Sequence, residues 1–211
     1  PSRKIKDRKN EPRGVSVQPG TYRLELKYLD YITSSSVNIK SDPRVEISEK
    51  AINETYQIGK ELEGLTQLTT NAVKQLVESK GIAKKYKTDL TEKDKVLYKE
   101  EIKISKEIIK KMDSIIDLYL GKEDKRQGIT NSDYVPVTQR LGTANWYSGS
   151  RPNGITKTEL VLMEQVKSQL KELLKETNLF FNVDWADYKA EMNQLDISPF
   201  KKTQTFFIKE E

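Results

Sequence analysis

The residues that could carry chemistry in this chain are carboxylates and aromatic side chains, because the sequence contains neither histidine nor cysteine. That absence excludes disulfides, thiolate nucleophiles, cysteine–histidine zinc sites and a histidine general base. Acids alone can hydrolyse glycosides, and Asp184 and Asp187 lie beside Trp185 and Tyr188. The same acids suit the first turn of a helix, where they oppose the macrodipole. We therefore favour helix capping and expect no catalytic residue in this chain.

Four aromatic residues are candidates for contact with a ligand or a protein partner. Trp146 and Tyr147 stand beside a glycine–serine stretch, while Trp185 and Tyr188 continue as a helical stripe to Met192. A role in the core of a helical bundle is the alternative for all four. No glycine-rich phosphate loop and no alternating set of oxygen ligands for calcium is present, so we expect no cofactor and no metal site.

The charge of the chain is concentrated at its beginning. The formal net charge is +5, and residues 1–13 hold six basic and two acidic side chains, which leaves 31 bases and 30 acids elsewhere. This indicates a basic linker rather than a basic domain, and no nucleic-acid partner is expected, because such a partner requires a basic stripe on a folded face. No apolar run is long enough to span a bilayer. The basic helix expected at 91–120 could lie on an acidic membrane, but its interleaved acids argue against that.

Alternating side chains predict two strands near the start of the chain. Tyr22, Leu24, Leu26 and Tyr28 fall on one face of a half-buried strand that follows the Pro19-Gly20 turn. A loop is expected from Asp30 to Ser36, then a second strand marked by Val37 and Ile39. Gly14 to Val17 could add a short edge strand. Two or three strands are marginal alone, so they should lean on the helices or on strands missing from this chain.

Steps of three and four between apolar residues predict helices over most of the remainder. One begins at the cap Ser48, breaks near 87–91 and is followed by a second from about Thr91 to Leu120, which together form an antiparallel hairpin. Gly59 lies on the apolar stripe, where close packing against a neighbour would explain it. A short helix spans Tyr134 to Trp146, and Ser148 to Gly154 is expected to be a loop. Thr156 and Glu159 form a capping box for a third long helix, which a short helix around Trp185 follows.

These elements predict a mainly α (α+β) chain in which an antiparallel bundle of three long helices follows two or three antiparallel strands. The expected divisions are a basic linker at 1–13, closing strands of a β-sandwich at 14–44, a helical bundle at 45–198 and a C-terminal tail at 199–211.

The order of these parts resembles the C-terminal region of bacterial, Bacteroidetes-type glycosyl hydrolases with BNR repeats and a sortilin-like propeller. Pro19-Gly20-Thr21-Tyr22 opens the first strand, and Ser41-Asp42-Pro43-Arg44-Val45 ends the second. The helices that follow include a short middle one that runs into a glycine–serine loop, together within Leu141–Gly154. In that family the first strand closes a small β-sandwich and the second leads into a helical bundle. The resemblance covers about residues 14–198. The Asp-box pattern of the propeller is not found, so no catalytic residue is carried over.

The resemblance implies a non-catalytic C-terminal structural or interaction module of a secreted enzyme, located outside the cell or in the periplasm. Its partner would be the propeller or sandwich of the parent chain. The alternative is a stand-alone helical-bundle domain that binds a protein partner along its long helical hairpin. The two hypotheses differ in one observable property. A module should leave the apolar side of the strands uncovered, whereas a stand-alone binder should expose its apolar patch on the helices.

Overall fold

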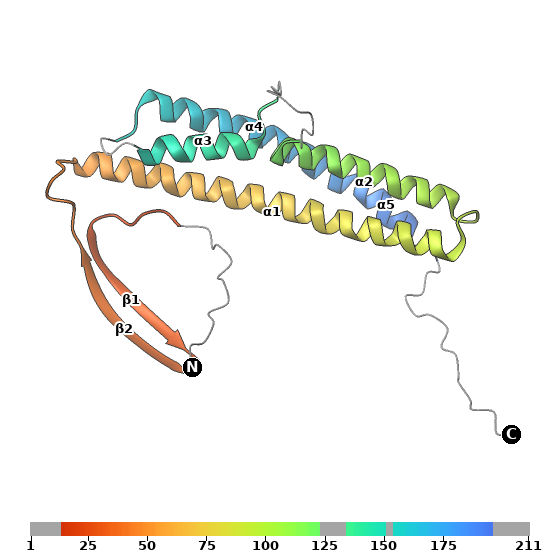
Figure 1. The fold of residues 1–211 in the computed structure, drawn as a ribbon, viewed down its shortest axis with the longest axis horizontal. Helices are drawn as coiled ribbons and strands as arrows, with labels where there is room; N and C mark the ends of the chain where they lie inside the picture. The colour runs from red at the N-terminus through yellow and green to blue at the C-terminus, as the bar shows by residue number, and fades with distance from the viewer. Residues whose placement is uncertain (1–13, 123–133, 151–153, 196–211) are drawn as a thin grey trace, which may run out of the picture.

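The computed structural model describes residues 14–122, 134–150 and 154–195, which form a hairpin followed by five helices. The prediction of a mainly α chain with antiparallel strands in front is confirmed (Figure 1). The predicted linker at 1–13 and tail at 199–211 lie outside the described residues. The elements are β1 (Gly20–Tyr28), β2 (Tyr31–Ile39), α1 (Glu49–Asp94), α2 (Lys99–Leu120), α3 (Val137–Ser150), α4 (Lys157–Asn182) and α5 (Asp184–Met192).

Helix α1 runs the length of the bundle, and the other long helices pack against it. Helix α2 lies antiparallel along the second half of α1, and α3 and α4 lie along its first half (Figure 1). Its buried residues Leu62, Leu76, Ala83 and Leu90 recur at multiples of seven, and Thr69 completes the series. The buried residues of α4 alternate in steps of four and three. Such seams favour the shallow crossing of left-handed bundles, in which ridges of one helix fill grooves of the next. The core is therefore built from neighbouring helices of one chain.

Two hydroxyl pairs lie inside this core. Ser105 and Tyr188 hydroxyls are 3.1 Å apart, and Tyr119 and Thr177 hydroxyls are 2.9 Å apart. Burial raises the pKa of both tyrosines, and the hydrogen bond from each partner hydroxyl offsets part of that rise. Because each hydroxyl has a partner, the core accepts these polar groups without a large desolvation penalty.

The helix break predicted at 87–91 is wrong. Helix α1 continues to Asp94, and the chain turns over residues 95–98 before α2 begins. The hydroxyls of Thr88 and Thr91 donate to carbonyls four residues earlier, so both residues are accommodated inside the helix. The turn is organised instead by Asp94, whose Oδ1 accepts the backbone N–H of Val96 and Leu97, each at 2.9 Å.

The capping box at Thr156 and Glu159 is confirmed, whereas the loop predicted from Ser148 begins too early. Helix α3 continues to Ser150. Ser148 is buried, and its hydroxyl donates to the Ala144 carbonyl at 2.8 Å. A composition rich in glycine and serine was misleading here, because the serine satisfies its hydroxyl within the helix.

The hairpin differs from the prediction in the length of its loop. The predicted loop at Asp30–Ser36 shrinks to Leu29 and Asp30, and Leu29 takes a positive φ of 53° in that turn. All nine residues of β1 pair with β2, and the serines at 34–36 lie within the ladder. No edge strand forms at Gly14–Val17, so within the described chain the sheet has two strands.

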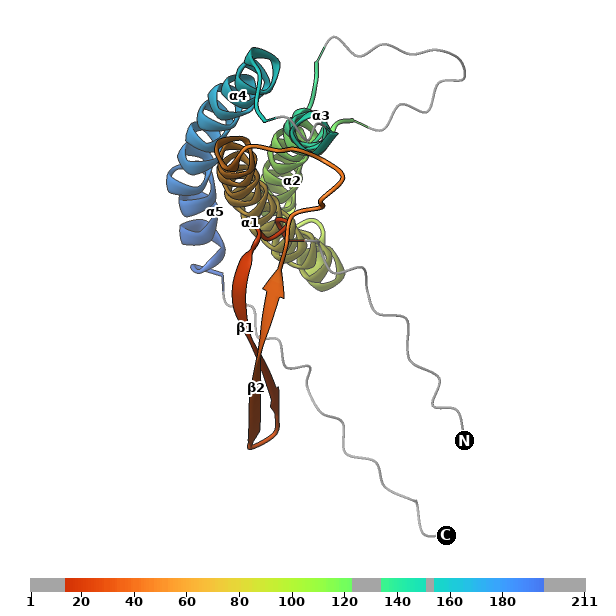
Figure 2. The ribbon, with the colours of Figure 1, turned by 90° about the vertical axis from the view of Figure 1, so that its left-hand side faces the viewer.

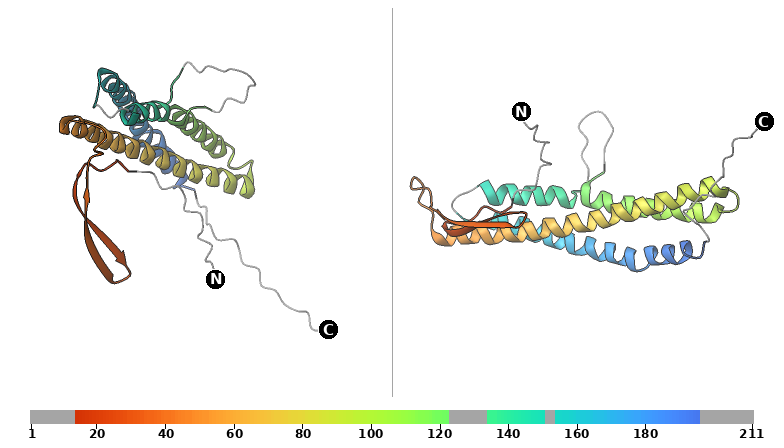
Figure 3. Two further views of the ribbon diagram at one scale, coloured as in Figure 1. Left: turned by 60° about the vertical axis from the view of Figure 1, so that its left-hand side comes forward. Right: turned by 90° about the horizontal axis from the view of Figure 1, so that it is seen from below.

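The hairpin projects from the first end of the bundle rather than lying on it (Figures 2 and 3). Among the described elements, neither strand contacts a helix. The prediction of a half-buried strand is therefore wrong for this chain taken alone, since both faces of the hairpin are largely open to solvent.

Candidate interaction site

The hairpin has one apolar face and one polar face. The antiparallel register places Tyr22 opposite Val37 and Tyr28 opposite Tyr31. Directly opposed residues of an antiparallel ladder point to the same side of the sheet. The apolar face of the hairpin therefore comprises Tyr22, Leu24, Leu26 and Tyr28 on β1 with Tyr31, Thr33, Ser35 and Val37 on β2, whereas Arg23, Glu25 and Lys27 lie on the other face.

This apolar face is uncovered in the structure. Leu24 is 58% exposed, Leu26 68%, Tyr28 70% and Tyr31 79%. Leu29 adds a further 73% exposed side chain at the turn. Single exposed apolar residues are ordinary, but a continuous face that joins two strands marks an interaction surface. Sequence reasoning found the β1 half of this face and the end of β2 at Val37, but it placed residues 31–36 in a loop because the three serines there give no apolar alternation.

The base of the hairpin is fixed to α1 by the segment that precedes it. Val15 packs on Gly59, where an added Cβ would come within 2.9 Å of Val15 Cγ1, so the expected reason for this glycine is confirmed. The Gln18 side chain donates to Asn53 at 3.3 Å, and the Tyr22 hydroxyl donates to the Gln18 carbonyl at 2.7 Å. These contacts set the direction in which the hairpin leaves the bundle.

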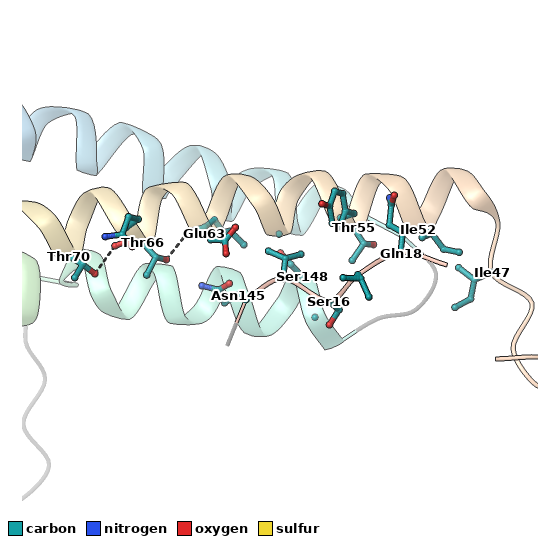
Figure 4. Close-up of a pocket in the computed structure, with 18 residues that line it drawn as sticks. Ser16, Gln18, Ile47, Ile52, Thr55, Glu63, Thr66, Thr70, Asn145 and Ser148 are labelled. Carbon is teal, nitrogen blue, oxygen red and sulfur yellow. Dashed lines mark hydrogen bonds between the residues drawn. The ribbon is translucent and has the colours of Figure 1, made fainter. Parts of the chain in front are cut away.

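A groove of about 680 Å³ lies beneath this segment, between the first half of α1 and the end of α3 (Figure 4). Figure 4 shows Thr66, Asn145 and Ser148 facing the groove from the two helices. Each of these side chains makes a hydrogen bond within its own helix. Thr66 donates to the Leu62 carbonyl at 2.7 Å, and Asn145 donates to the Leu141 carbonyl at 3.0 Å. Thr55, Tyr56 and Glu63 also line the groove, so its wall carries polar groups beside its apolar surface.

The structure separates the four aromatic candidates. Trp146 is 66% exposed on the outer side of α3, and its ring meets that of half-buried Tyr147 edge to face at 4.9 Å. Trp185 and Tyr188 instead lie in the core at 7% and 3% exposure, stacked at 5.2 Å. Only the first pair is accessible to a partner in this conformation, and it lies on a different element from the hairpin.

The acidic candidates take structural positions. Asp184 forms an ion pair with Lys111 of α2, and both Asp184 and Asp187 lie in the first turn of α5, where acids oppose the macrodipole. Neither of them caps the helix by a side-chain hydrogen bond, since the N-cap residue is Val183. In the part of the chain that the structure describes, no three acidic side chains gather as metal ligands. Across the same residues, none of the helices is long and apolar enough to cross a bilayer.

Searches against models of protein families, curated proteins and solved structures found no match to this chain.

Proposed function

We propose that this chain is a non-catalytic interaction module whose β-hairpin docks on a β-sheet of another polypeptide segment, foremost the rest of a larger parent protein. The observation that carries the proposal is the uncovered apolar face of the hairpin. A two-stranded hairpin is marginally stable in water unless something covers its apolar face. Here the helices of the same chain leave it uncovered.

The edges of the hairpin support docking by strand pairing. Strand β2 contains no charged residue, no proline and no glycine along its nine residues, whereas β1 carries Arg23, Glu25 and Lys27. Charged side chains and proline are the usual protection of a free strand edge. The unprotected β2 edge is therefore the side on which we expect another strand to pair.

The resemblance to BNR-repeat, sortilin-like glycosyl hydrolases suggests a specific parent. In that proposal the docked sheet is the small sandwich beside the propeller, and the parent enzyme is secreted. The helices would then hold the end of the protein together or present a surface to a further partner. The stand-alone alternative receives less support, because exposed apolar residues on the helices are dispersed, as at Val77, Ile82 and Leu160.

The proposal is tested by hydroxyl-radical footprinting of the intact natural gene product beside the 211-residue chain. We expect a product several times heavier than this chain, with Tyr28 and Tyr31 protected in it and labelled in the short chain. Trp146 is the internal control, because it is equally accessible on α3 and should be labelled in both.

A matched pair of variants separates docking from mere proximity. Leu24→Asn on the apolar face should restore labelling of Tyr28 in the intact product, while Lys27→Gln on the polar face should not. A natural product of about the size of this chain would contradict the module proposal. Equal labelling of both tyrosines in the long and short proteins would contradict docking of the hairpin.

A further inference from the structure

The second surface with a distinct character lies at the opposite end of the molecule and is basic. Residues 80–111, which form the end of the α1–α2 hairpin, carry eleven lysines and six acids, for a net charge of +5. The rest of the described residues carry 14 bases and 18 acids, for a net charge of −4. Among the described residues, positive charge is therefore collected at one end of the bundle.

Seven of these lysines form two stripes, one on α1 and one on α2. On α1, Lys80, Lys84 and Lys87 follow one another at steps of four and three, and on α2 the same spacing repeats. Residues spaced in this way share one side of a helix. The lysine face of the bundle comprises Lys80, Lys84 and Lys87 on α1 with Lys99, Lys103, Lys106 and Lys110 on α2.

One ion pair shows that the two stripes lie side by side. Lys80 forms an ion pair with Asp113, which is the next position of the α2 stripe after Lys110. Because the helices are antiparallel, residues after Lys80 lie opposite residues before Asp113, which sets Lys87 across from Lys106. Of the acids that argued against a basic face in the sequence, Glu92 and Glu101 lie more than about 100° around the helices from these stripes. Glu100 and Glu107 flank the α2 stripe, and Asp94 follows Lys87 by seven residues on the α1 stripe.

The lysine face is open and mostly unpaired. Lys84, Lys99, Lys106 and Lys110 are exposed, and within the described residues none of them has an ion-pair partner. Lys103 meets Glu100 only at 4.0 Å. Helix α5 packs on another side of the α1–α2 helical hairpin, where it contacts Ser105, Lys111 and Tyr86. No described element covers the face.

We propose that the lysine face binds the surface of an anionic lipid bilayer. The cations of this face are all lysines, which act as point charges and suit the mobile headgroups of a bilayer. Phosphates in fixed positions are more often bound by arginine, whose guanidinium donates two hydrogen bonds in a set geometry. Neither stripe carries an exposed aromatic side chain on which bases could stack, as single-stranded nucleic acid requires.

Three exposed apolar side chains support the same partner. Val77, which precedes Lys80 on the α1 stripe, is 51% exposed. Val96 and Leu97 are 85% and 70% exposed. They lie in the turn between α1 and α2, at the end of the two lysine stripes. Aliphatic side chains beside a basic stripe add hydrophobic contact at the boundary between headgroups and acyl chains. This inference does not depend on the docking of the β-hairpin.

The test measures flotation of the 211-residue chain with vesicles of phosphatidylcholine that contain 0 or 30 mol% phosphatidylglycerol, at low and at physiological salt. We expect binding only to the anionic vesicles and weaker binding as salt rises. Each lysine at such a surface contributes about five-fold in affinity. Replacing Lys84, Lys87, Lys106 and Lys110 together by glutamine should therefore reduce binding by several hundred-fold.

A matched control removes the same number of charges elsewhere. Replacing Lys50, Lys74, Lys157 and Lys171 by glutamine should leave most of the binding intact, and circular dichroism verifies the fold of both variants. Equal loss in the two variants would make net charge the cause and overturn the proposal. Binding that survives in the first variant would point to the basic segment 1–13 and also overturn it. No binding to anionic vesicles, or preference for a single-stranded 20-nucleotide DNA, would have the same consequence.

Discussion

The contact between Gly59 and Val15 offers the sharpest test of how the hairpin is held. Replacing Gly59 with alanine adds a Cβ that would come 2.9 Å from Val15 Cγ1 and 3.6 Å from Cγ2. Real Cβ atoms do not come that close, so the segment 14–18 must shift away from α1. We expect the shift to break the hydrogen bond between Gln18 and Asn53 and to loosen the base of the hairpin.

The magnitude follows from two opposing effects. Alanine is favoured over glycine inside a helix by about 1 kcal/mol, and Gly64 of the same helix provides this reference because an added Cβ there meets nothing within 4 Å. Forcing an extra methyl into a packed contact costs roughly 1–3 kcal/mol. Gly64→Ala should therefore raise the free energy of unfolding by about 1 kcal/mol, and Gly59→Ala should be roughly 1–3 kcal/mol less stable than Gly64→Ala.

The assay is thermal and denaturant unfolding of both variants, followed by circular dichroism. For a chain of this length 1 kcal/mol corresponds to about 2–4 °C in melting temperature. Adding Val15→Ala to Gly59→Ala should recover much of the difference, because it removes both methyl groups that the new Cβ meets. If Gly59→Ala and Gly64→Ala are equally stable, Val15 does not pack on α1 and the account of the hairpin base fails.

Three further changes test the bundle itself. Thr156→Ala, which removes the side-chain half of the capping box, should lower stability by roughly 0.5–2 kcal/mol in urea unfolding, and Thr156→Ser should restore it. Leu170→Ala, at a position 1% exposed, should cost about 2–5 kcal/mol, while Leu160→Ala at 56% exposure should cost far less. Stability should fall at alkaline pH, because the raised pKa values of Tyr119 and Tyr188 let the unfolded chain ionise first. That contribution is complete below the ordinary tyrosine pKa of about 10 and is lost as pH rises through the folded values; replacing both tyrosines with phenylalanine should flatten the alkaline limb of the stability profile.

Helical periodicity was sufficient to predict most of the bundle. The stripe in α4, the capping box and α5 follow from spacing and residue type, because long amphipathic helices carry their period in every turn. The break between α1 and α2 was placed too early, at residues that include Thr88 and Thr91. Their hydroxyls bond inside the helix, and the weaker local signal at Asp94 makes the turn.

The interaction surfaces were only partly predictable. The β1 half of the hairpin face is an obvious alternation, but Ser34–Ser36 of β2 carry no strand propensity of their own and extend because β1 pairs with them. Trp185 and Tyr188 could have been core or contact residues until the packing of α5 against α2 was known. The lysine face depends on which stripe of α1 lies beside which stripe of α2, and a single ion pair reveals that register.

Because α1 is uninterrupted, it connects the two ends of the molecule as a rigid rod. From Asn53, where the base of the hairpin is tied, to Lys87 on the lysine face, the helix runs for 34 residues without interruption. At 1.5 Å per residue that separation is about 50 Å. α2, α3 and α4 pack along this helix and resist bending. A protein attached to the β-hairpin and a surface bound by the lysine face would be kept apart by a fixed distance. A force applied at one end of α1 would be transmitted directly to the other end.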